Sequence, residues 1–353
     1  MVYQPSKAIH PGATVQRTLD SSGMTQKRLA ERTGLSEKHI SQIINGEASI
    51  TADTAFLLQN AVGGTASFWL NLDKNYRETL ARLEQEEKAF EEVVCLANFP
   101  YGDLVKLGKV EATKSQIEKV INLWKFFGVN SLNSIRQTEA VAYRRGYGKG
   151  VRQEALAAWL RCGELDAAKL ELGEFNESNL RSLLSIIREM TQMIENDFFT
   201  KTQALLASAG VGLVAAPHLA ATQAHGATRW IGKNPVIQLS IRRKNADTFW
   251  FTLFHEIAHI FLHGKKDQFI SFNSGTKSNE ETEADIFAAR TLIPDDVYRD
   301  FLVKQDLSEG AIRNFAEDQK INPGIVVGRL KNDGWLVYGS YQNLHAKLEM
   351  KEN

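Results

Sequence analysis

The residues with the clearest chemical meaning are two histidines that flank a glutamate, in the run His255-Glu256-Ile257-Ala258-His259. Residues four apart lie on one face of a helix, so both imidazoles can bind one Zn²⁺ ion. The intervening Glu256 is the type of residue that acts as general base on a water molecule. Apolar residues surround the run, which predicts a buried helix in which these polar groups would be costly without a metal.

A third ligand is expected from the downstream run Glu281-Thr282-Glu283-Ala284-Asp285, because a catalytic zinc usually takes three protein ligands and a water molecule. Glu281 and Asp285 are four residues apart and share a helix face. We therefore predict Glu281 as the third ligand and Asp285 as a residue that orients a ligand histidine. Glu283 points to nearly the opposite side of a regular helix, so it is the third ligand only if the helix is irregular and is otherwise a surface charge.

His263 continues the stripe of His255 and His259, but an ideal helix places it about 12 Å from His255 along the axis. One zinc ion cannot span that distance, so we expect His263 to be a helix-end residue beside Gly264. Hydrolysis would also need a group that stabilises the developing oxyanion. Four residues are candidates, and the sequence does not choose among them: Tyr338, Tyr341, His345 and His225.

The N-terminal stretch predicts short amphipathic helices separated by glycines. Thr25 and Ser36 are expected to cap helices over 26–33 and 37–45, with Gly34 ending the first of them. Two helices joined in this way form a helix-turn-helix, whose second helix enters the major groove of DNA. We predict contacts to operator DNA by Glu37, Lys38, His39, Ser41 and Gln42 in the groove, and by Gln26, Lys27 and Asn45 toward the phosphate backbone. The alternative is a helical dimerisation or adaptor module.

The length of 353 residues predicts two or three domains, each with its own core. We place a five-helix helix-turn-helix domain at 1–83, in which Thr51 and Ser67 open the last two helices, a helical middle region at 84–205 and a C-terminal domain at 206–353. Strands are expected only in the last domain, over GVGLVAA, NPVIQLSIR and DQFISF. The sequence therefore predicts a mostly α fold with a small sheet (α+β). The second of these strands could present an edge to an extended peptide.

Composition narrows the classes of function. The 42 Lys and Arg balance 42 Asp and Glu, so DNA binding would rest on a few local side chains and on a homodimer, with little help from long-range attraction. Two cysteines, Cys95 and Cys162, form neither a disulfide framework nor a thiolate metal site. No apolar run reaches the roughly 20 residues of a bilayer span, so we expect a cytoplasmic protein with no membrane partner.

Two segments resemble known families. The N-terminal segment, with HPG, TQKRLAERTGLS, INGEASIT, ADTA and FWLNL, resembles the Cro/CI-type helix-turn-helix of HigA-like antitoxins. The segment from about Thr200, with FHEIAHIFLHG, EETEAD, FAARTLIP and PGIVVGRL, is similar to the ImmA/IrrE family of zinc metallopeptidases. That family pairs HExxH with a downstream ExxA[ND] motif, which residues 281–285 match, so the resemblance implies a zincin-like C-terminal domain.

The resemblance to both families implies a DNA-binding transcriptional regulator with a zinc-dependent endopeptidase domain. ImmA/IrrE members act on repressors of the helix-turn-helix type, which implies cleavage of a partner repressor or of the chain itself. HigA-like proteins instead neutralise a small toxin protein and repress their own operon. This second alternative is a non-enzymatic antitoxin of a toxin-antitoxin module with a structural or sensory metal site, and the sequence does not choose between the two.

Overall fold

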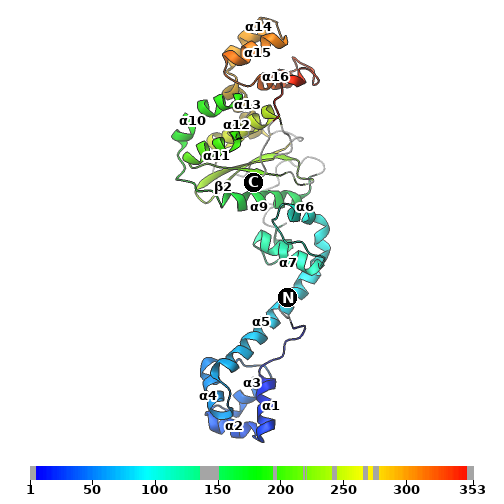
Figure 1. The fold of residues 1–353 in the computed structure, drawn as a ribbon, viewed down its shortest axis with the longest axis vertical. Coiled ribbons are helices and arrows are strands. Elements are labelled where there is room, and N and C mark those ends of the chain that lie inside the picture. The colour runs from blue at the N-terminus through cyan, green and yellow to red at the C-terminus, as the bar shows by residue number, and fades with distance from the viewer. Residues whose placement is uncertain are drawn as a thin grey trace. The chain divides into compact units, whose positions relative to one another are not determined.

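The computed structural model describes residues 5–135, 151–193, 197–217, 219, 221–240, 245–264, 269–272 and 278–347. Contacts divide the chain into two compact units, Met1–Val94 with Lys114–Ile121, and Cys95–Thr113 with Asn122–Asn353. The described residues form mostly helices and one four-stranded sheet (Figure 1), which confirms the predicted α+β class.

Five helices form most of the first unit: α1 (Gly12–Ser22), α2 (Gln26–Thr33), α3 (Glu37–Ile44), α4 (Ala52–Val62) and α5 (Ala66–Glu91). Thr25, Ser36 and Thr51 begin α2, α3 and α4, because each side-chain oxygen accepts a hydrogen bond from a backbone N–H of the first helical turn. Thr65 caps α5 in the same way. The prediction that Ser67 opens the fifth helix is therefore wrong, because Ser67 lies inside α5. Either hydroxyl fits the capping pattern, and only the backbone shows which one lies outside the helix.

The helix-turn-helix has its own apolar core. Gly34 ends α2 with a φ angle of 72°, which a glycine adopts at little cost, and this turn lets α3 pack against α2. Gly12 allows a close approach of α1 to α3, since a Cβ atom there would lie 2.1 Å from the carbonyl oxygen of Ile43. The largest side chains of this core are Leu19, Leu29, Ile40, Ile43, Leu58 and Trp69.

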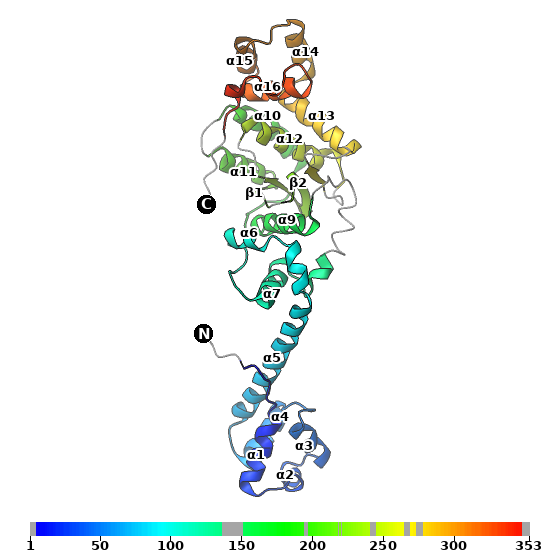
Figure 2. The same cartoon turned by 90° about the vertical axis from the view of Figure 1, so that its right-hand side faces the viewer.

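The sheet of the second unit contains β1 (Gly212–Ala216), β2 (Ala224–Ile231), β3 (Asn234–Ser240) and β4 (Phe269–Phe272), in the spatial order β1-β3-β2-β4. β1 and β3 pair in parallel, whereas β2 pairs antiparallel with both β3 and β4. Figure 2 shows α9 (Gln153–Ala167) on one face of the sheet and α12 (Ala246–Leu262) on the other. The sheet is therefore covered on both faces.

The strand order corrects the expectation that the segment NPVIQLSIR presents an edge. Its described part is β3, an internal strand with neighbours on both sides, so it has no free edge for a peptide. Residues 236–239 are all buried, as expected for a strand between two layers of helices. β2 has no counterpart among the predicted strands and joins β3 through a tight turn at Gly232, whose φ angle is 62°. The ends of the sheet are β1 and β4.

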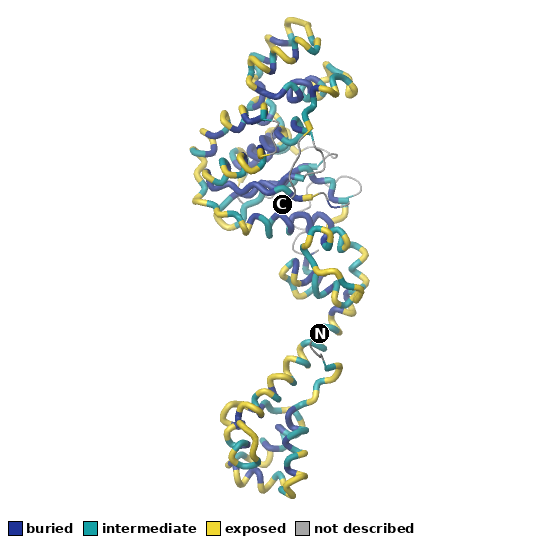
Figure 3. Tube along the Cα trace, in the orientation of Figure 1, coloured by how far each residue is buried: buried dark blue, intermediate teal, exposed yellow. Residues whose placement is uncertain are grey.

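The other helices whose bounds lie within the described residues are η1 (Val93–Asn98), α6 (Tyr101–Lys106), α7 (Gln116–Phe127), α10 (Glu177–Glu189), η2 (Met190–Gln192), α11 (Phe198–Ser208), α13 (Asn279–Leu292), α14 (Asp295–Val303), α15 (Glu309–Asp318), α16 (Pro323–Asn332) and η3 (Gln342–Leu344). Residues of α10 and α11 share one apolar core with the sheet, α12, α13 and α16. Figure 3 shows this buried core running through the sheet and α12. The core thus includes helices N-terminal to residue 206, where the predicted C-terminal domain begins. The predicted domain ranges 1–83, 84–205 and 206–353 therefore stay a proposal.

Among the described helices, none combines the length and the apolar character that a bilayer crossing requires.

Candidate metal centre and nucleic-acid interface

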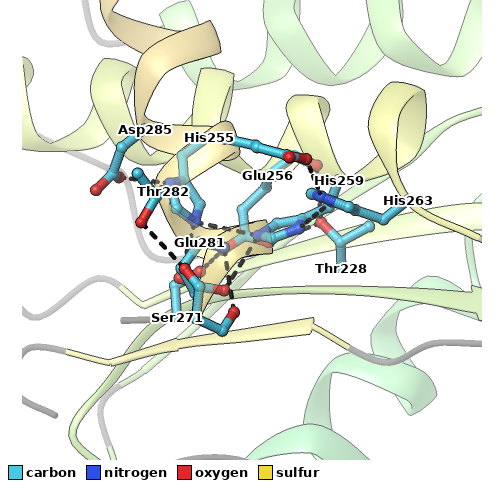
Figure 4. Close-up of polar contacts among 11 residues, drawn as sticks. Thr228, His255, Glu256, His259, His263, Ser271, Glu281, Thr282 and Asp285 are labelled. Atoms are coloured by element: carbon cyan, nitrogen blue, oxygen red, sulfur yellow. Dashed lines mark hydrogen bonds and ion pairs between the residues drawn. The ribbon is translucent and has the colours of Figure 1, made fainter. Parts of the chain in front are cut away.

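Two helices of the second unit bring the predicted metal ligands together. His255 and His259 lie one turn apart on α12, and Glu281 lies in the first turn of α13. The Nε2 atoms of the two histidines are 3.1 Å apart, and the Glu281 carboxylate oxygens lie 3.2 Å from His255 Nε2 and 3.3 Å from His259 Nε2 (Figure 4). One ligand atom from each residue falls within 4.8 Å of the others, so the three can hold one metal ion.

The charges at this cluster favour a bound cation. Burial alone would lower the pKa of His255, but hydrogen bonds to Asp285 and Glu281 raise it to about 10. Burial would raise the pKa of Glu281, but hydrogen bonds with His255 and His259 lower it to about 2. The cluster therefore holds a positive charge as a proton when no metal is bound, and a divalent ion could replace that proton.

Asp285 occupies the place that an orienting residue requires. It lies one turn after Glu281 on α13, and its Oδ1 atom is 2.9 Å from Nδ1 of His255. With Asp285 as acceptor, the proton of a neutral His255 is on Nδ1, which leaves the lone pair of Nε2 directed at Glu281 and His259. This contact is the one expected of a residue that orients His255, and the orienting role of Asp285 stays a prediction.

Glu256 is completely buried where α12 faces the sheet. The hydroxyl of Ser271 on β4 donates to one carboxylate oxygen at 2.7 Å, and the hydroxyl of Thr228 on β2 donates to the other at 2.7 Å. Burial raises the pKa of Glu256, while the two neighbouring histidines and these hydroxyls act in the opposite direction. Sequence reasoning missed Thr228 and Ser271 because they lie on strands distant from α12 in sequence and belong to no distinctive motif.

Gly226 explains why the Glu256 carboxylate can lie so close to β2. A Cβ atom at Gly226 would lie 2.2 Å from Oε1 of Glu256, well inside van der Waals contact. We expect Gly226→Ala to displace the carboxylate and to lower the free energy of unfolding of the metal-free protein by about 1–3 kcal/mol. The measurement is urea unfolding of both proteins in the presence of a chelator.

The control for this prediction is Gly310→Ala, since a Cβ atom at Gly310, near the start of α15, meets no heavy atom within 4 Å. It should leave stability within about 0.5 kcal/mol of the parent protein, as exposed substitutions usually do. Equal stability of the two variants would contradict the close contact of Gly226 with Glu256.

His263 ends α12, as expected from the sequence, but it also contacts a predicted ligand. Its Nδ1 atom is 2.9 Å from Nδ1 of His259, and its Nε2 atom is 3.4 Å from Oε2 of Glu283. Burial and His259 lower the pKa of His263, against the opposing effect of Glu283. The sequence predicts that Glu283 is a surface charge, or the third metal ligand if the helix is irregular. In the structure its side chain is largely exposed and faces His263.

The residues considered for oxyanion stabilisation lie in different surroundings. Tyr341 donates its hydroxyl to the carbonyl oxygen of Leu307 at 2.9 Å, and Tyr338 is 87% exposed. His345 lies 3.1 Å from a carboxylate oxygen of Asp247 at the start of α12. His225 is part of β2, next to Gly226. The choice among these four stays open.

The helix-turn-helix leaves its predicted DNA-contacting side chains accessible. Ser36 fixes the start of α3 by accepting a hydrogen bond from the N–H of His39, which defines the end of α3 that would enter a groove. None of the eight predicted residues is buried: Gln26, Lys27, Glu37, Lys38, His39, Ser41, Gln42 and Asn45. Three of them have side-chain partners, because Gln26 donates to Gln16 at 3.2 Å and Asn45 donates to Ser41, another of the eight, at 3.4 Å. Their contacts to DNA remain predictions.

The helix-turn-helix of the first unit and the His-His-Glu cluster of the second define the class of protein: a DNA-binding domain joined to a domain of metallopeptidase type. Comparison with family models agrees with both halves. A helix-turn-helix model matches residues 15–69, and the peptidase M78 model, described as the IrrE N-terminal-like domain, matches residues 210–331.

Two relatives match the chain over a shorter length. Virulence-associated protein I of Dichelobacter nodosus is 33% identical over 91 residues, which cover 26% of this chain and 82% of that protein. Antitoxin HigA-1 of Vibrio cholerae serotype O1 is 38% identical over 72 residues, which cover 20% of this chain and 68% of that protein. The chain belongs to the HigA-like helix-turn-helix family and carries, in addition, an IrrE N-terminal-like domain of the peptidase M78 family.

Two solved structures are also similar to part of the chain. An addiction module antidote protein of the HigA family from Coxiella burnetii is 33% identical with a TM-score of 0.23, and the match covers 24% of this chain and 95% of that one. The antitoxin HigA of Pseudomonas aeruginosa, solved with the higBA promoter, is 28% identical with a TM-score of 0.21, and the match covers 21% of this chain and 83% of that one.

Proposed function

We propose that the chain is a transcriptional regulator that binds operator DNA through its first unit and hydrolyses peptide bonds through a zinc site in its second. The observation that carries the proposal is the convergence of His255, His259 and Glu281 next to a completely buried Glu256. The peptidase M78 match supports it, because residues 210–331 include all four. The substrate we propose is a helix-turn-helix repressor or the chain itself.

Zinc is the metal that best fits these donors. Two imidazole nitrogens and one carboxylate form a set that binds Zn²⁺ and leaves a fourth position for water or substrate. His255, His259 and Glu281 would hold the ion, and the carboxyl groups of the buried Glu256 and of Asp285 would help to balance its charge. Bound there, zinc would act as a Lewis acid that polarises the peptide carbonyl and lowers the pKa of water.

The protein's own groups would move the proton. Glu256 would accept a proton from the attacking water and pass it to the nitrogen of the leaving amine. Burial raises the pKa of Glu256, which favours holding the proton between these two transfers. The hydroxyls of Thr228 and Ser271, each 2.7 Å from a different carboxylate oxygen, hold the base in one orientation.

A substrate peptide would lie along β4. This strand pairs with β2 on one side, and no strand in the described part of the chain pairs with its other side. Ser271 of β4 contacts Glu256, and the ring of Phe269 stacks on His259 with the ring centroids 4.3 Å apart. A peptide added to the sheet next to β4 would therefore run past the metal cluster.

The first test is the metal content of the purified protein. We expect one zinc ion per chain, and we expect Glu281→Ala to reduce the bound zinc strongly because it removes one of three ligands. Glu317→Ala, on an exposed part of α15, serves as the control. Protein that binds no zinc after dialysis against zinc would rule out the proposed peptidase.

Operator binding would need a homodimer, because helix-turn-helix proteins usually read two half-sites with a two-fold axis between them. We expect Gln42→Ala in α3 to weaken operator binding by about 5- to 150-fold, as the loss of one good base contact costs about 1–3 kcal/mol. Gel shifts at fixed salt measure this effect, and Asn60→Ala on α4 is a matched amide control. A loss that is equal in the two variants would argue against α3 as the recognition helix.

A second function is supported by the similarity to antitoxin HigA-1. In this alternative the chain binds a small toxin protein, represses its own operon, and uses the metal site structurally or as a sensor. It predicts that a small toxin gene neighbours this one and that Glu256→Gln leaves operator binding unchanged. Failure to shift its own promoter at low salt would contradict the alternative.

A further inference from the structure

The last histidine of α12 forms a link between the predicted metal cluster and the protein surface. His263 Nδ1 lies 2.9 Å from Nδ1 of His259, on the opposite side of that imidazole from the Nε2 atom that faces Glu281. His263 Nε2 in turn lies 3.4 Å from the carboxylate of Glu283. The three side chains therefore form a continuous polar path that starts at a ligand and ends at an exposed carboxylate.

The direction of the hydrogen bond between the two histidines follows from the role of His259. If Nε2 of His259 is to bind a metal, a neutral His259 carries its proton on Nδ1. That proton is donated to Nδ1 of His263, which must then be unprotonated, since a contact between two nitrogens needs one donor and one acceptor. The proton of His263 is left on Nε2, on the side of Glu283.

We propose that His263 is a positioning residue that fixes the tautomer and the ring orientation of His259, with Glu283 holding His263 in place. The arrangement parallels the one on the other ligand, where Asp285 accepts directly from Nδ1 of His255 at 2.9 Å. For His259 the acceptor is His263 in place of a carboxylate, and the carboxylate of Glu283 contacts His263 on its other side. Each ligand histidine thus has a partner that directs its Nε2 atom at the metal.

Stacking on β4 supports the same orientation. The ring of Phe269 lies parallel to that of His259, with an interplanar angle of 10° and centroids 4.3 Å apart, and it also contacts His263 with centroids 4.9 Å apart. The aromatic contact limits rotation of the His259 ring, and the hydrogen bond to His263 selects which nitrogen faces the cluster. His263 is not a ligand in this arrangement, because its Nδ1 atom faces His259 and its Nε2 atom faces Glu283.

The test measures zinc affinity by competition with a chromophoric chelator, using the full chain. We expect His263→Phe to weaken zinc binding by about 10- to 100-fold, the usual cost of losing a residue that orients a ligand. We expect His263→Asn to restore most of the affinity, since its amide oxygen can accept from His259 at about the position of Nδ1. Glu283→Ala should cause a smaller loss because this carboxylate is largely exposed, and Glu317→Ala is the control.

Two further readouts separate a positioning role from other roles. The zinc stoichiometry should stay at one, and the visible spectrum of the cobalt-substituted protein should show the same ligand set in the parent and in His263→Asn. Unchanged zinc affinity in His263→Phe would overturn the proposal. An equal loss of affinity in His263→Phe and His263→Asn would also overturn it, provided that both variants keep the melting temperature of the parent protein in the presence of a chelator. A second bound metal lost with His263 would overturn it as well.

This inference rests on the zinc site of the proposed function, but it is tested without a substrate. A parent protein that binds zinc and cleaves nothing would refute the peptidase and leave the role of His263 supported by the affinities. A parent protein that binds zinc with variants of unchanged affinity would refute the role of His263 alone. A parent protein that binds no zinc would refute both.

Discussion

The Glu256→Gln variant is expected to lose peptidase activity by about 10²- to 10⁴-fold while it retains its zinc. An amide cannot accept the proton of the attacking water, so the step that Glu256 performs would be left to solvent. The substitution preserves the size of the side chain, and the hydroxyls of Thr228 and Ser271 can still hydrogen-bond to an amide in that place. The measurement is the rate of cleavage of a fluorescently labelled unfolded protein, together with the zinc content of both proteins.

The matched control for this prediction is Glu317→Gln, which makes the same chemical change on the exposed face of α15. It should leave the rate unchanged. Cleavage by Glu256→Gln at the rate of the parent protein would show that another residue is the general base, or that the protease activity comes from a contaminant.

Zinc removal is expected to lower the free energy of unfolding of the second unit by about 4 kcal/mol. This value applies to a comparison with protein in free zinc at about a thousand times the dissociation constant. The physical reason is mass action on the native state, because unfolded chain does not bring residues of α12 and α13 together. Glu256 and both histidines are buried, and without zinc only the proton on the imidazoles balances the carboxyl groups of the cluster. The melting temperature of the second unit should therefore fall on addition of a chelator and return on addition of zinc.

The first unit provides an internal control, because its core is formed by its own five helices. Its melting transition and its DNA affinity should be the same with and without chelator. His255→Ala should mimic the chelator and should no longer respond to it. A chelator that shifts neither transition would contradict a zinc site in the native protein.

Local patterns predicted the parts of the site that lie on one helix. The i, i+4 spacing of His255 and His259, and of Glu281 and Asp285, was enough to predict that each pair shares a face, because a helix has a fixed period. The axial distance separated His263 from the predicted metal ligands, and its ring nitrogens face His259 and Glu283 in the structure. It did not reveal that His263 contacts His259, since the same i, i+4 rule that aligns two ligands also aligns a ligand with its neighbour.

Contacts between elements could not be predicted in this way. Thr228, Ser271 and Gly226 contact or flank Glu256 from two strands, and their positions depend on the strand order and on the approach of α12 to the sheet. For the same reason the edges of the sheet are β1 and β4 while β3 is internal, because pairing partners in a sheet are not encoded by the alternation of apolar residues. β2 begins with small residues, Ala224 to Ala227 with one histidine, and so lacks the β-branched pattern that indicates a strand.

The most direct test of the account is mass spectrometry of cleavage products formed in H₂¹⁸O. The zinc-loaded chain would be incubated alone and with the helix-turn-helix repressor encoded nearest to it. The account predicts fragments whose new C-terminal carboxylates carry ¹⁸O, formed by the parent protein and absent with Glu256→Gln or with a chelator. Intact proteins under all conditions, or the same fragments from the Glu256→Gln variant, would contradict a zinc-dependent peptidase with Glu256 as its base.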